Sequence, residues 1–153
     1  MQGMTGFKKI LCPVDFSPSA EKALRYAEGL AKHFGSEILL VHAYEDPAYI
    51  MPMTGYLGPE AGLINQLRAH LEEQLDNWQS AVAKAGFAVR TELLEGTAHQ
   101  VVVDAAKQHA VDLIVMSTHG RTGLSHALMG SVAERVIRLA HCPVLTVRSA
   151  PVS

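Results

Sequence analysis

The chain has 153 residues, of which 48% are hydrophobic and 18% are charged, and its formal net charge is −2. This length and mixture indicate a single globular domain over residues 1–153 and exclude a disordered chain. The sequence contains no run of lysines and arginines. We therefore expect neither a nucleic-acid-binding surface nor a patch for anionic membranes, since both need clustered positive charge.

No apolar run is long enough to cross a bilayer, and Pro13 interrupts the first apolar run too early for a signal peptide. These features predict a cytoplasmic protein with no membrane partner. Cys12 and Cys142 lie in apolar stretches. In a cytoplasmic chain, both are predicted to be reduced, buried thiols.

The first part of the chain alternates between short apolar runs and helical stripes. Residues 9–14 form an apolar run that predicts a strand. Ser17 and Pro18 then have the sequence of an N-cap followed by a proline at the first helical position. Apolar residues at three- and four-residue spacing predict an amphipathic helix that ends at Gly35. Residues 38–41 predict a second strand.

Residues 44–59 interrupt this rhythm, because their three prolines and two glycines predict a long irregular loop. One apolar face over residues 63–82 predicts a long second helix, which Gly86 closes. Residues 88–94 predict a third strand, and their lower apolar content favours an edge of the sheet.

Two segments in the second half of the chain have capping-box spacing, in which a hydroxyl side chain precedes Gln or Glu by three residues. Thr97 and Gln100 predict the start of a third helix, and Ser131 and Glu134 predict the start of a fourth. The apolar stripes of these two helices are Val101, Val102, Ala105 and Ala106, and then Val132, Val136, Ile137 and Ala140.

Two further apolar runs, residues 111–116 and Pro143–Val147, complete five predicted strands that alternate with helices. This pattern predicts an α/β three-layer sandwich with a parallel sheet covered on both faces. Ligands of such sheets bind beyond the carboxyl ends of the strands, where the strand order reverses. Polar and glycine-rich residues gather after the first and fourth strands. A site there requires these strands to be neighbours, which predicts the order 3-2-1-4-5.

The segment 117–131 carries the strongest binding signal, because its glycines allow backbone N–H groups to approach a ligand closely. Ser131 opens a helix whose first N–H groups and dipole attract anions, and Arg121 adds a charged contact for phosphate. Asp15 suits ribose hydroxyls or a cation. The P-loop and dinucleotide fingerprints are both missing from the sequence. From spacing alone, the alternative that the glycines only shape a loop and a helix cap stays open.

Three stretches of the chain carry a resemblance to a known family. From Lys8 the sequence reads KKILCPVDFS, from Met116 it reads MSTHGRTGLSHALMGSVAERV, and from His141 it reads HCPVLTVR. Taken together, they resemble the universal stress protein family, and the similarity extends over nearly the whole chain except residues 44–59.

The ATP-binding branch of that family carries Gly-x-x-Gly, nine further residues, and then Gly followed by Ser or Thr. Gly120, the nine-residue spacing and Gly130-Ser131 match this pattern. Ser117 stands where the pattern has its first glycine. The side chain of Ser117 is thus the one departure from the motif.

The resemblance implies a Rossmann-like fold of the adenine nucleotide alpha hydrolase-like type. It also implies a dimeric, ATP-binding regulatory module of the stress response, with ATP bound with or without Mg²⁺. No residue of the sequence stands out as a base for activating water, so we expect slow or no hydrolysis. The homodimer would form through Pro143–Val147, where an unpaired apolar edge strand would otherwise be a liability. The residues implied around the nucleotide are Pro13, Val14, Asp15, Ala43, Met116, Ser117, His119, Gly120, Arg121, Gly130, Ser131, Val132 and Ala133.

Two other functions stay open. The chain is alternatively a weak Mg²⁺-dependent ATP hydrolase in which Asp15 holds the metal, or a nucleotide-independent dimeric interaction protein, which Ser117 favours. His42 is predicted to be a packed histidine. We expect no structural metal, because no compact zinc pattern is formed by His119, His126, His141 and Cys142. No G-x-S-x-G elbow supports a serine hydrolase.

Overall fold

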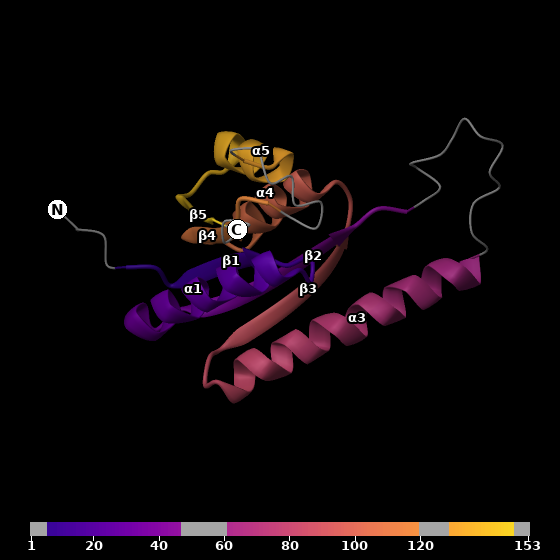
Figure 1. Ribbon diagram of the computed structural model, residues 1–153, viewed down its shortest axis with the longest axis horizontal. Helices are drawn as coiled ribbons and strands as arrows, with labels where there is room; N and C mark the ends of the chain where they lie inside the picture. The colour runs from indigo at the N-terminus through magenta and orange to yellow at the C-terminus, as the bar shows by residue number, and fades with distance from the viewer. Residues whose placement is uncertain (1–5, 47–60, 120–128, 149–153) are drawn as a thin grey trace, which may run out of the picture.

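The computed structural model describes residues 6–46, 61–119 and 129–148, which form a parallel sheet with helices on both of its faces (Figure 1). The strands are β1 (Lys9–Pro13), β2 (Glu37–Tyr44), β3 (Val89–Glu95), β4 (Leu113–Ser117) and β5 (Val144–Val147). The helices are α1 (Pro18–Phe34), α3 (Ala61–Lys84), α4 (Ala98–Gln108) and α5 (Ser131–Leu139). The three-layer α/β architecture predicted from the sequence is confirmed.

The five strands have the order β3-β2-β1-β4-β5, as predicted, and β3 lies at an edge. In the central strand, Leu11 pairs with Leu39 of β2 on one side and with Ile114 of β4 on the other. The strand order therefore reverses between β1 and β4. In an open parallel sheet this is the position where the carboxyl ends of the strands leave room for a ligand.

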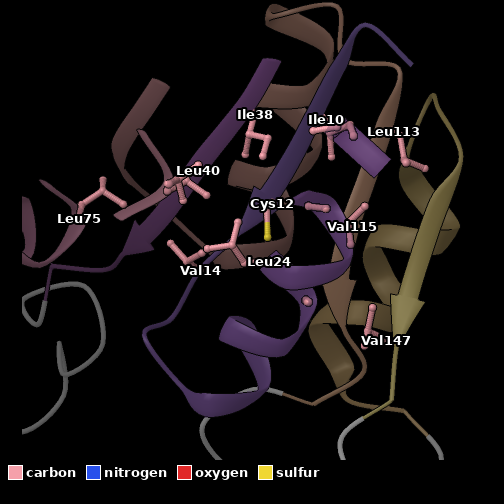
Figure 2. Close-up of a cluster of buried hydrophobic side chains, with 14 residues drawn as sticks. Ile10, Cys12, Val14, Leu24, Ile38, Leu40, Leu75, Leu113, Val115 and Val147 are labelled. Carbon is pink, nitrogen blue, oxygen red and sulfur yellow. The ribbon is translucent and has the colours of Figure 1, made fainter. Parts of the chain in front are cut away.

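Two apolar clusters fill the space between the sheet and its helices. One lies under α1 and α3, and Figure 2 shows its side chains, with the sulfur of Cys12 among them. The other lies under α4 and α5 and includes the fully buried Val136. Because successive side chains of a strand point to opposite faces, β1 supplies Ile10 and Cys12 to the first cluster and Leu11 to the second.

Both predicted ends of α1 are confirmed. The Ser17 hydroxyl oxygen accepts a hydrogen bond from the Ala20 N–H at 3.1 Å, and Pro18 is the first helical residue. At the other end, Gly35 has a left-handed conformation with a φ of 71°, and its N–H donates to the Ala31 carbonyl at 2.7 Å. This helix start directly follows β1 and fixes the turn beside the centre of the sheet.

The predicted capping boxes are wrong. Thr97 does cap α4 by position, but its hydroxyl donates to the Glu45 carboxylate at 3.0 Å, since a charged acceptor competes well with a backbone group. Gln100 instead donates to Asp104 at 2.8 Å. In α5 the cap is Gly130, one residue before the predicted Ser131, because its extended backbone already has the conformation of a cap.

Two predicted apolar stripes are partly wrong. In α5, Val132 and Ile137 are exposed, whereas Ala133 and Val136 are buried, because the helix turns its narrow face onto the second cluster. In α3, the first residue of the stripe, Leu63, is exposed. The buried residues of this helix lie in its C-terminal half. Figure 1 shows the N-terminal part of α3 extending beyond the sheet.

Several boundaries differ from the prediction. Strand β2 continues to Tyr44, so the predicted loop over residues 44–59 begins later, and most of it lies outside the described residues. Both cysteines are free thiols, but only Cys12 is fully buried, whereas Cys142 is half-buried. Within the described ranges, no helix has the length and apolar character needed to span a membrane.

Candidate functional site

A cleft of about 260 Å³ opens at the carboxyl ends of β1, β2 and β4, where the strand order reverses. Most of the residues that the sequence nominated lie together in its walls: Pro13, Val14, Asp15, Ala43, Met116, Ser117, Gly130, Ser131, Val132 and Ala133. His119 follows the lining residue Thr118 but does not itself line the cleft. Gly120 and Arg121 lie outside the described residues.

The cleft also includes residues that the sequence reasoning missed: Ala20, Val41, His42, Ala98, Val102 and Thr118. Ala98 and Val102 belong to the first turns of α4, which begins beside the cleft because β3 pairs with β2. The signal for His42 and Thr118 was their position in the chain next to Ala43 and Ser117. A parallel sheet brings whole strand ends together and not selected residues.

The turn after β1 presents a carboxylate to the cleft. One oxygen of Asp15 accepts a hydrogen bond from the Ser17 N–H at 3.0 Å, and the Ser17 hydroxyl in turn caps α1. Between them, Phe16 has a left-handed backbone with a φ of 64°, which bulky side chains rarely adopt. The orientation of the Asp15 carboxylate is therefore set by a turn that the start of α1 holds in place.

The opposite wall is a close contact between two backbone segments. The Gly130 N–H donates to the Thr118 carbonyl at 2.7 Å, and a Cβ atom on Gly130 would lie only 2.8 Å from that same oxygen. The Thr118 N–H donates to the Val147 carbonyl at 3.0 Å, so β5 holds this segment from behind. The requirement for glycine at 130 thus comes from the close approach of two backbone segments, whereas the sequence analysis assigned it to the approach of a ligand.

Ser117 has a structural use for its hydroxyl group. Its Oγ donates to the His119 carbonyl at 2.7 Å and so closes a small turn at the end of β4. The next residue, Thr118, is buried, and its Oγ1 atom lies 3.1 Å from the Nδ1 atom of His119. The serine that departs from the family motif therefore stabilises the loop beside the cleft.

The chemistry of the cleft differs from one end to the other. Val14, Val41 and Met116 are buried and supply apolar surface. Asp15 supplies a carboxylate on one side, while α5 begins on the other side at Ser131, with its first N–H groups and the positive end of its dipole. An apolar slot between a hydrogen-bond acceptor and an anion-attracting helix end fits a ligand with a flat ring, hydroxyls and phosphate.

The titratable groups near the cleft do not form a metal centre. Across residues 6–46, 61–119 and 129–148, no group of three or more His, Cys, Asp or Glu side chains is close enough together to hold a metal ion. Burial, together with the nearby charge of Glu28, raises the pKa of the Cys12 thiol to about 12. The Cys12 thiol is therefore protonated at neutral pH.

The model of the universal stress protein family matches residues 6–148. The chain belongs to the universal stress protein family. Universal stress protein MJ0531 of Methanocaldococcus jannaschii is 37% identical over 147 residues, which cover 93% of this chain and 82% of that protein. Universal stress protein MJ0577 of the same organism is 31% identical, and the match covers 93% of this chain and 95% of that protein.

Solved structures of this family share the fold of the chain. The structure of hypothetical protein MJ0577 has a TM-score of 0.82 and 32% identity, and the match covers 95% of this chain and 98% of that one. The structure of a universal stress protein from Archaeoglobus fulgidus in complex with dAMP has a TM-score of 0.64 and 25% identity, with 94% and 98% covered. At least one relative of this chain has therefore been seen with an adenine nucleotide.

Proposed function

We propose that this universal stress protein binds ATP in the cleft beyond β1, β2 and β4, as a dimeric regulatory module with slow or no hydrolysis. The observation that carries the proposal is the backbone contact of Gly130 with Thr118, where a side chain would displace the wall of the cradle at the start of α5. The complex of the Archaeoglobus fulgidus relative with dAMP supports adenine as the base.

The apolar end of the cleft suits the base and the ribose. Val14 and Met116 are buried beside the cleft and offer flat contacts to an adenine ring. Ala43 contributes backbone at the end of β2, which we assign to the edge of the base. Asp15 accepts a hydrogen bond from Ser17 and presents its carboxylate to the ribose hydroxyls, which are donors.

The polar end of the cleft suits the phosphates. Ser131 is exposed, lines the cleft and is the first residue of α5, so we assign the first N–H groups of the helix to the phosphates. Val132 and Ala133 complete this wall. We assign Gly120 and Arg121 to the phosphates as well, from the family motif, although both lie outside the described residues. Mg²⁺ would enter as the counterion of ATP.

We expect hydrolysis to be slow because Asp15 and His42, the described side chains of the cleft that could act as a base, are both hydrogen-bonded to backbone groups. Asp15 accepts from the Ser17 N–H, and the Nδ1 atom of His42 lies 2.6 Å from the Val14 carbonyl. A general base for hydrolysis must reach the attacking water at hydrogen-bond distance. Binding without rapid turnover suits a module whose nucleotide state is read by a partner.

The dimer is proposed to form through Pro143–Val147. Strand β5 is the last strand of the sheet, and Leu145 within it is 38% exposed. An apolar residue on an edge strand favours pairing with the same strand of a second chain. Formation of this dimer does not depend on the nucleotide.

Replacement of Ser131 separates an effect on ATP binding from an effect on the stability of the fold. In Ser131→Glu, a negative charge at the helix start stabilises α5 by about 0.3–1 kcal/mol but repels phosphate. We expect calorimetric titration to show ATP affinity falling at least tenfold, while Ser131→Gln, of matched size, loses much less. Adenosine, which has no phosphate, should bind both variants equally. A wild-type protein that takes up no ATP at millimolar concentration would refute the proposal.

A further inference from the structure

His42 lines the cleft and makes a specific hydrogen bond there. It lies near the end of β2, and its Nδ1 atom is 2.6 Å from the carbonyl oxygen of Val14. A carbonyl oxygen only accepts hydrogen bonds, so the Nδ1 atom carries the hydrogen and donates it. The ring is thereby fixed in one tautomer and one orientation beside the turn that follows β1.

This bond completes a clamp on the backbone of Val14. The Val14 N–H donates to the Val41 carbonyl at 2.9 Å, and the Val14 carbonyl accepts from the side chain of His42. Consecutive residues of β2 therefore hold both polar groups of the residue that precedes Asp15. The position from which the Asp15 backbone departs is consequently fixed by β2.

His42 also supports the residue that follows Asp15. Phe16 has its left-handed φ of 64°, a conformation that costs free energy and needs compensating contacts. Its ring packs on the His42 ring with centroids 4.6 Å apart and on Trp78 of α3 with centroids 5.7 Å apart. One imidazole thus contacts the neighbours of Asp15 on both sides.

We propose that His42 is a positioning residue for ribose recognition, acting through Val14 and Phe16 on the carboxylate of Asp15. The inference rests on the proposed nucleotide site and adds to it a residue that selects for the sugar hydroxyls. The donor at Nδ1 and the ring face make separable contributions, because one holds Val14 and the other holds Phe16.

Two variants separate the contributions of the donor and the ring. His42→Phe keeps an aromatic ring against Phe16 but removes the hydrogen that binds Val14. His42→Asn keeps an N–H donor near the position of Nδ1 but removes the ring. Calorimetry with ATP and with 2′,3′-dideoxy-ATP then measures the preference of each protein for the ribose hydroxyls, with Asp15→Asn as the reference for losing that preference.

We expect the wild-type protein to favour ATP over the dideoxy nucleotide by at least tenfold. His42→Phe should reduce this ratio to below about threefold, and His42→Asn should restore most of it. Adding His42→Phe to Asp15→Asn should change the ratio no further, because both substitutions act on one contact.

A His42→Phe variant that keeps the full preference would overturn the inference, as would equal losses of both nucleotides in both variants. A wild-type protein that binds neither nucleotide would instead refute the proposed function and this inference with it. One readout needs no variant to fold: nitrogen NMR of the ATP-bound wild-type protein at about pH 8 should show a hydrogen on the Nδ1 atom of His42. A hydrogen found only on the Nε2 atom would also overturn the inference.

Discussion

Adding one methyl group to Gly130 tests the backbone contact at the centre of the proposed site. Gly130 has a φ of −71°, which alanine adopts freely, so Gly130→Ala introduces no backbone strain. The new Cβ atom would lie 2.8 Å from the Thr118 carbonyl oxygen, and backbone cannot move aside as a flexible side chain does. Overpacking of this kind costs about 1–3 kcal/mol, whereas replacing glycine restricts the unfolded chain and returns about 0.4–1 kcal/mol.

The net effect of Gly130→Ala should be a loss of roughly 1–2 kcal/mol in the free energy of unfolding, measured by urea denaturation. We expect ATP affinity to fall at least tenfold, because Thr118 must shift and the cradle opens. Gly29→Ala is the matched control: Gly29 lies in α1 with nothing within 4 Å of an added Cβ atom. That variant should gain up to about 1 kcal/mol from helix propensity. Unchanged stability and affinity in Gly130→Ala would refute the reasoning.

Two further predictions concern the buried thiol and the edge strand. Because burial raises the pKa of Cys12 to about 12, the folded protein keeps a proton that the unfolded chain releases above about pH 8.5. Stability should therefore fall as pH rises from about 8.5, by on the order of 2 kcal/mol near pH 10, relative to Cys12→Ala; parallel pH curves for the two proteins would contradict this. Leu145→Lys should shift the chain from dimer to monomer in sedimentation equilibrium, because a charge on an exposed edge-strand position opposes pairing; a dimer that persists would remove β5 from the interface.

Much of the fold could be predicted because its signals are local. Continuous apolar runs mark buried parallel strands, and Ser17, Pro18 and Gly35 mark the ends of α1 by backbone chemistry alone. The strand order followed from a functional argument, since polar residues after β1 and β4 require these strands to be neighbours. Such signals do not depend on distant parts of the chain.

The predictions failed where the conformation or exposure of a residue depends on a group that is distant in the chain. The capping hydroxyl of Thr97 bonds to Glu45, which lies 52 positions away in the chain, and no spacing rule contains that partner. The exposure of Val132 depends on how α5 lies over the sheet, which periodicity cannot specify. Likewise, His42 is half-buried against Phe16, as a packed histidine would be, but it also lines the cleft.

Most of the described residues that line the cleft could be predicted from the sequence, but their hydrogen bonds could not. The sequence nominated Ser117 both as a residue around the nucleotide and as a departure that favours a nucleotide-independent protein, but it did not predict that the Ser117 hydroxyl donates to the His119 carbonyl. The contribution of α4 was missed because the sequence interpretation rested on the residues that follow the first and fourth strands, whereas α4 follows the third. In the structure, β3 delivers the start of α4, with Ala98, to the cleft.

The most direct test of the account follows the backbone amides of the protein by NMR during a titration with ATP. We predict saturable shifts concentrated at Asp15, Ala43, Gly130 and Ser131, which line the cleft from three separate parts of the chain. Amides at the opposite end of the sheet, such as that of Lys9, should stay unchanged. Shifts confined to another surface, or none at millimolar ATP, would contradict the central claim that this cleft binds the nucleotide.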